Sequence, residues 1–187
     1  VPHAAPYAFE LSRRHPEIEV TIAASSDAEL AVAAKIGGLY PGHRCTLLRL
    51  HAAWWYGPLD SLVSRFAFAR KDRILADNLE FFAGLTALVA PERHFRRLRT
   101  RHRLSKLKLI HTRHGAGDRK GTSDATMALF DLVLLPGRKY ADRFGKLGYL
   151  RPGQYEITGW PKFEAVRALN PDPRRFFDNA NLVAVYN

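Results

Sequence analysis

The sequence has little cysteine and no long apolar run, and each absence excludes a class of protein. Its single cysteine is Cys45, so neither an internal disulfide nor a zinc site built from several cysteines is available. Its apolar runs are strand-sized, and none approaches the roughly 18–20 residues that a membrane-spanning helix needs. The amino terminus shows neither the basic start nor the apolar stretch of a secretory signal. We therefore expect a cytoplasmic protein in which Cys45 is a buried, inert thiol.

Apolar residues and positive charge are plentiful, but the charge is concentrated in one place. Hydrophobic residues make up 47% of the 187 residues, enough to build the core of one large domain. Residues 92–108 hold eight cationic side chains and one acid, and so carry seven of the eleven net positive charges. A local patch of this kind predicts a local anionic partner and not a generally basic protein.

Short apolar strands alternate with amphipathic segments along the whole chain. Strands are expected at 18–24, 45–50, 85–90, 106–112, 131–135, 155–158 and 182–186. Helices are expected at 4–14, 28–36, within 59–82, and at 92–103, 124–129, 138–147 and 163–169. Ser26 and Glu29 have the spacing of a capping box that opens the second of these helices. This alternation predicts an α/β fold with a Rossmann-like, mostly parallel sheet and helices on both faces.

The pattern also predicts how the chain is divided into domains. Residues 1–169 form the Rossmann-like domain, and residues 170–187 contain a linker and the first strand of a second domain. We expect a strand upstream of Val1 to supply the start of the first domain. The second domain would then follow Asn187, and the 187 residues alone would be inactive.

The loop that follows the strand 106–112 is the richest in chemistry. Ligands of parallel α/β sheets bind at the carboxyl ends of the strands, and here His114, Gly115, Gly117 and Arg119 follow such an end. A histidine in this place can take a proton from a hydroxyl nucleophile, although a solvated turn has the same composition. Because strand side chains alternate, His111 should face the opposite side of the sheet from His114. The loop lacks the Gly-Lys-Ser/Thr ending of a Walker A motif.

Three motifs in order carry a resemblance to a known family. They are His114-Gly115, the run from Phe130 to Gly137, and the turn Thr158-Gly159-Trp160-Pro161. Over roughly residues 106–165 the sequence resembles the CDP-glycerol glycerophosphotransferase family, which is similar in architecture to UDP-N-acetylglucosamine 2-epimerases and other GT-B transferases.

The resemblance implies a transferase of cell-envelope, teichoic acid-like polymers. His114 would be the general base on a hydroxyl acceptor, and Thr158 and Gly159 would lie near the interdomain cleft. The donor, CDP-glycerol or a nucleotide sugar, would be bound mainly by the second domain. Backbone groups of Gly115 and Gly117, with Arg113 or Arg119, would stabilise phosphate charge. Neither a cofactor nor a metal ion is expected.

The basic segment permits a second function from another class. Arg96, Arg97, Arg99 and Arg101 could face an anionic membrane, because each cation near an acidic leaflet contributes about 1 kcal/mol. The chain would then be peripheral on the inner face of the membrane, or a non-catalytic α/β module that binds an anionic polymer. A solvated arginine-rich face remains the alternative. Nucleic acid is not favoured as a partner, because no recognised nucleic-acid module accompanies the charge.

Overall fold

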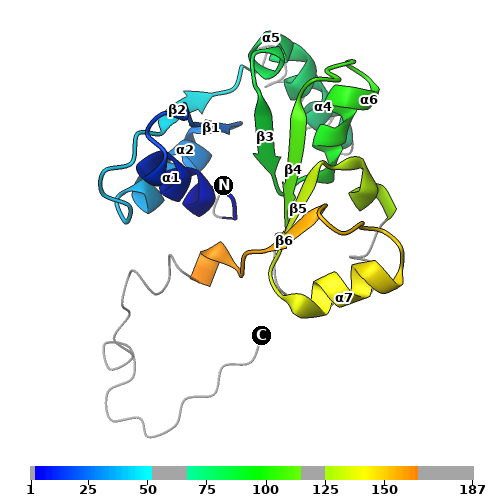
Figure 1. Ribbon diagram of the computed structural model, residues 1–187. Coiled ribbons are helices and arrows are strands. Elements are labelled where there is room, and N and C mark those ends of the chain that lie inside the picture. Colours follow the sequence, from blue (N-terminus) through cyan, green and yellow to red (C-terminus); the bar gives the residue numbers. More distant parts are fainter. Residues whose placement is uncertain (1–2, 52–66, 115–124, 164–187) are drawn as a thin grey trace, which may run out of the picture.

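The computed structural model describes residues 3–51, 67–114 and 125–163, and its strands are all parallel. One sheet pairs β1 (Thr21–Ala24) with β2 (Thr46–Arg49). The other has the order β3 (Ala87–Ala90), β4 (Lys108–Thr112), β5 (Leu132–Leu135) and β6 (Tyr155–Ile157). Figure 1 shows the pair β1–β2 on the side of β3 that faces away from β4. The predicted α/β fold with a Rossmann-like parallel sheet is confirmed.

Helices connect the strands, as the sequence pattern predicts. The described helices are α1 (Ala5–Arg14), α2 (Asp27–Gly37), α4 (Ala67–Asp77), α5 (Leu79–Ala83), η2 (Arg93–Arg96), α6 (Arg97–Thr100), η3 (Ala125–Leu129) and α7 (Arg138–Lys146). Helix α1 packs on α2, and α7 packs on β5 and β6. The helix predicted at 163–169, apart from its first residue, and the strand predicted at 182–186 lie outside the described residues.

The second helix starts where the capping box predicts. The Ser26 hydroxyl accepts a hydrogen bond from the Glu29 N–H at 3.2 Å, which satisfies one of the free amides at the start of α2. The Glu29 carboxylate reaches back to the amide and hydroxyl of Ser25, both at 2.8 Å. In the usual capping box this carboxylate accepts from the amide of the N-cap residue, here Ser26. In this protein it accepts from Ser25, one residue earlier.

The apolar strands and helix faces bury one main core and a smaller one. The main core lies between the four-stranded sheet and its helices, and its most buried members include Phe82, Leu98, Leu109, Leu135 and Phe144. The smaller core lies between α1, α2 and β1, and comprises Ala5, Phe9, Ile22 and Ala33. Ala23 of β1 packs against the main core, which joins the two sheets.

The prediction of one continuous helix over residues 92–103 is wrong. The segment forms the 3-10 turn η2 and the single α-turn α6, and regular structure ends at Thr100. Arg103 then takes the left-handed conformation at φ +57°. The chain must reverse here to enter β4 at Lys108, and a helix extended to residue 103 would leave too few residues for that reversal.

Asp131 ties the amino ends of β4 and β5 together. Its Oδ2 accepts a hydrogen bond from the Leu109 N–H at 2.7 Å and pairs with the Arg99 guanidinium. Arg99 also donates to the Leu107 carbonyl at 2.9 Å. This acid belongs to one of the motifs that carry the family resemblance, and its contacts here are structural.

Replacing Asp131 with alanine should lower the free energy of unfolding by about 2 kcal/mol. The Leu109 amide would lose its acceptor and Arg99 its carboxylate, and a polar group left without a partner costs about 1–3 kcal/mol. Chemical denaturation measures the change. Asp131→Asn keeps an oxygen acceptor and should lose less. Equal stability of Asp131→Ala and the parent would contradict this role.

Candidate active site at the carboxyl edge of the sheet

His114 lies just beyond the carboxyl end of β4, with its side chain 54% exposed. Its Nε2 is 3.4 Å from Oε1 of Glu92, which follows the neighbouring strand β3. Parallel strands end at one edge of the sheet, so β3 and β4 deliver these two side chains to the same place. The carboxylate can stabilise the imidazolium that forms when His114 takes a proton.

A second histidine reaches His114 from the amino-terminal side of α1. The rings of His3 and His114 meet edge to face, with centroids 5.1 Å apart. The pKa of His3 is lowered, first by burial and then by the nearby charges of His114 and Lys162. His3 therefore stays neutral beside His114 at neutral pH, and adds no positive charge that would oppose proton uptake there.

The Glu92 carboxylate is shared with a third histidine. Its Oε2 lies 3.5 Å from Nδ1 of His94, whose ring stacks on Phe95 with centroids 4.4 Å apart. The His94 ring is therefore packed against Phe95 and lies next to the second oxygen of the Glu92 carboxylate. Glu92 and His3 are the site residues that sequence reasoning missed. The signal for Glu92 was its place two residues after a predicted strand end.

His111 lies within β4 and is buried, whereas His114 is exposed; β4 ends at Thr112, so the alternation of the strand does not extend to His114. His111 is 4% exposed and packs on Phe130, with ring centroids 4.9 Å apart. Burial, followed by the charges of Arg113 and Arg93, lowers its pKa to about 4. His111 is therefore neutral at pH 7 and belongs to the core.

The Arg113 side chain packs on aromatic rings of α7. Its guanidinium lies 4.3 Å from the centroid of the Tyr140 ring on α7 and 5.8 Å from that of Phe144. Burial lowers the pKa of Arg113, and the phenol of Tyr140 acts in the opposite direction. The Arg113 guanidinium therefore lies against α7, whereas His114, its neighbour in sequence, lies next to Glu92.

The Thr-Gly-x-Pro turn reaches the same edge of the sheet at the end of β6. The Thr158 hydroxyl lies 2.7 Å from the hydroxyl of Tyr7 on α1, within hydrogen-bond distance. Gly159 has φ +75°, a left-handed conformation that favours glycine. The structure thus brings together Thr158, Gly159 and the start of α1. Gly115, Gly117 and Arg119 lie outside the described residues.

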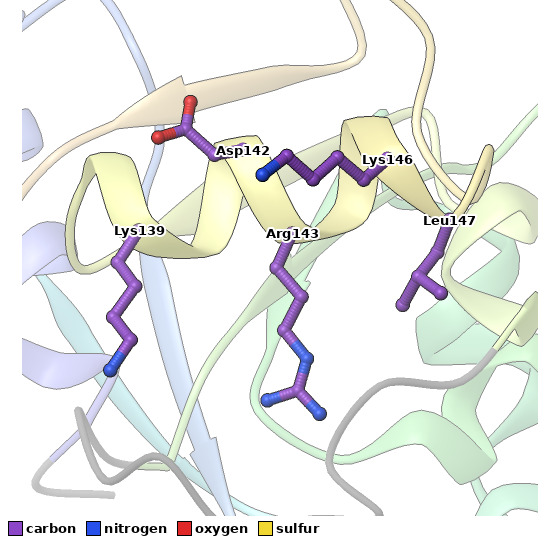
Figure 2. Close-up of a pocket in the computed structure, with 5 residues that line it drawn as sticks. All are labelled: Lys139, Asp142, Arg143, Lys146 and Leu147. Atoms are coloured by element: carbon purple, nitrogen blue, oxygen red, sulfur yellow. The ribbon is translucent and has the colours of Figure 1, made fainter.

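A groove of about 510 Å³ runs along α7, lined by side chains at helical spacing (Figure 2). Its lining residues are Lys139, Asp142, Arg143, Lys146 and Leu147. Figure 2 shows Lys139 and Arg143 projecting to one side of the helix, Asp142 projecting to the other, and Lys146 extending along the helix towards Asp142. Three cations, one acid and one leucine therefore line this groove.

Part of the basic segment is paired with acids of the same chain. Arg97 and Arg101 both pair with Asp72 of α4, the latter at 3.3 Å, and Arg99 pairs with Asp131. Three of the four arginines predicted to form the anionic-surface patch are therefore engaged by acids of the same chain, although Arg101 is 66% exposed. Across the described residues, no helix has the length and apolar character needed to cross a membrane.

Neither a group of metal-binding side chains among the described residues nor a similar known protein adds to this description of the site. Within residues 3–51, 67–114 and 125–163, no three histidine, cysteine or acidic side chains are grouped to hold a metal ion. No family model matches the chain, and neither curated proteins nor solved structures contain a significant match.

Proposed function

We propose that this chain is the acceptor-side part of a transferase that moves a glycerophosphate or sugar group from a nucleotide-activated donor to a hydroxyl. The observation that carries the proposal is the pairing of an exposed imidazole, His114, with the Glu92 carboxylate at the carboxyl edge of a parallel sheet. Ligands of such sheets bind at this edge. The order of motifs shared with the CDP-glycerol glycerophosphotransferase family supports the same reaction class.

In the proposed reaction, the Glu92 carboxylate faces Nε2 of His114. The other ring nitrogen, Nδ1, takes the proton of the acceptor hydroxyl. The acceptor oxygen forms a bond to phosphorus, or to the anomeric carbon of a sugar, as the bond to the departing nucleotide oxygen breaks. The negative charge leaves with the nucleotide, and the proton is held on an imidazolium next to Glu92. The donor, CDP-glycerol or a nucleotide sugar, would be bound mainly by a second domain.

The cellular setting follows from the same proposal. The acceptor would be a growing cell-envelope polymer, and the protein would work in the cytoplasm at the inner face of the membrane. The rival proposal is a non-catalytic module that binds an anionic surface through its basic segment. That proposal has less support, because Arg97, Arg99 and Arg101 are engaged with Asp72 and Asp131.

Glu92→Gln in the intact protein tests the pair directly. We expect turnover with a nucleotide-activated donor to fall by up to about fivefold, since an ion pair between partly exposed groups is worth about 0.2–1 kcal/mol. A purely structural role for Glu92 would lower the free energy of unfolding and leave the turnover of the folded protein unchanged.

Two matched variants control this experiment. Glu17→Gln removes a carboxylate from another exposed histidine, since Glu17 lies 3.1 Å from His15 at the far end of α1. His94→Ala removes a neighbour of Glu92 that the proposed proton transfer does not use. Both variants should keep the parent turnover. Catalysis that is unaffected by Glu92→Gln would argue against the proposed pair.

A further inference from the structure

A second group of polar side chains lies beside His114, where the start of α1 meets the turn after β6. The Tyr7 hydroxyl on α1 and the Thr158 hydroxyl after β6 are 2.7 Å apart, so a hydrogen bond holds the two segments together. His3 precedes α1, and its ring touches that of His114. Lys162 follows β6, and its charge acts on His3. These two segments, which are distant in sequence, therefore bring His3 and Lys162 to the same place.

The charges that act on His3 within the described chain are all positive. Burial is the largest cause of its lowered pKa, and the charges of His114 and Lys162 lower that pKa further. The first turn of α1 contains no acidic residue, although an acid there would complement the positive end of the helix. Glu92 contacts His114 and not His3. A negative charge that entered beside Lys162 and His3 would therefore be attracted.

Two buried nitrogens of this group have no hydrogen-bond partner among the described residues. They are Nδ1 of His3 and Nε1 of Trp160. Lys162 lies over the Trp160 ring, with Nζ 5.8 Å from the ring centroid. An indole N–H and a lysine ammonium can only donate, and a neutral imidazole donates through one of its nitrogens. A buried polar group without a partner is destabilising, so these donors call for an acceptor, and the described side chains do not supply one.

A phosphate group has the charge and the oxygens that these donors require. It carries about −1.5 to −2 charges at pH 7 and three strong acceptor oxygens, and lysine is a common phosphate ligand. A carboxylate has one charge and two oxygens, so it cannot offer each of the three donors an oxygen of its own. The groove along α7 also holds cations, but none of its lining side chains has a buried atom that lacks a partner among the described residues.

We propose that His3, Trp160 and Lys162 form a phosphate subsite, and that the phosphate it holds belongs to the acceptor. His114 is the proposed base on the acceptor hydroxyl, and its ring touches that of His3. The phosphate and the reacting hydroxyl therefore belong to one small unit of the acceptor. The subsite selects acceptors that carry a phosphate near that hydroxyl. The assignment to the acceptor rests on the proposed function, whereas the phosphate subsite itself does not.

Calorimetric titration of the intact protein with inorganic phosphate tests the subsite without any measurement of activity. Lys162→Gln removes the ammonium, and His3→Phe removes the imidazole nitrogens but keeps an aromatic ring against His114. We expect each to weaken phosphate binding about tenfold, since each removes a donor to a charged group. Lys146→Gln is the matched control, because it removes an exposed lysine from the α7 groove. It should bind phosphate as the parent does.

Steady-state kinetics with two acceptors show which substrate carries the phosphate. With glycerol 3-phosphate and glycerol as acceptors and one nucleotide-activated donor, the parent should have the lower KM for glycerol 3-phosphate. Lys162→Gln should raise that KM about tenfold and leave the KM for glycerol and for the donor unchanged. A rise confined to the KM of the donor would overturn the assignment to the acceptor and give the subsite to the donor phosphates.

His114→Ala separates failure of the subsite from failure of the proposed function. It should keep the parent affinity for inorganic phosphate while turnover is lost. If turnover also persists, the proposed function fails and the phosphate subsite stands. Three results would overturn the subsite. They are no phosphate binding by the intact protein, parent-like binding by both Lys162→Gln and His3→Phe, and an equal loss of binding in Lys146→Gln and Lys162→Gln, which would indicate attraction by the overall charge.

Discussion

Replacing His114 with alanine in the intact protein should lower turnover about 10²–10⁴-fold, the usual cost of losing a general base. Its side chain is 54% exposed and makes no core contact that folding needs. The free energy of unfolding should therefore stay near that of the parent. Donor affinity should also persist, since the donor is proposed to bind mainly on another domain.

The matched control for this prediction is His15→Ala. His15 is also an exposed histidine, 52% exposed, and pairs with Glu17 at 3.1 Å, but it lies at the far end of α1. It should keep parent turnover. Steady-state kinetics with CDP-glycerol and with nucleotide sugars, together with chemical denaturation, separate the two variants. Near-parent turnover of His114→Ala with every donor that the protein accepts would refute the proposed base.

The free energy of unfolding should fall by about 3 kcal/mol as the pH drops from 7 to 4, because of His111. The unfolded imidazole has its ordinary pKa of about 6.5, whereas burial and the charges of Arg113 and Arg93 lower the folded pKa to about 4. The unfolded state therefore takes up the proton first. The contribution is complete above pH 6.5 and is lost as the pH falls through this window.

Urea denaturation between pH 7.5 and 4.5, on the parent and on His111→Leu, measures this contribution. The leucine variant cannot titrate, so its stability should depend much less on pH over this range. The lowered pKa of His3 acts in the same direction, and a smaller slope should therefore remain. Glu10, whose pKa is about 2 because of its hydrogen bond to Arg13, titrates below this range. Identical slopes in the two proteins would contradict the prediction.

The sequence by itself determined the elements of the fold and the place of His114. Apolar runs of four or five residues predict strands, and Ser26 predicts a helix start, because both patterns depend only on residues close in sequence. The strands, the start of this helix and the parallel α/β class could therefore be predicted from local pattern. The positions of the two histidines were also a local matter, because His111 lies in the apolar run of β4 and His114 follows the end of that run.

Only the tertiary structure decided which distant side chains meet. Glu92 and His114 follow different strands, and Arg99 and Asp131 are 32 residues apart in sequence, so no local pattern links either pair. The break after Thr100 has the same origin, because the chain must turn back to place Lys108 beside Ala87. Ion pairs and strand order depend on how separate elements pack, and this packing is a property of the whole chain.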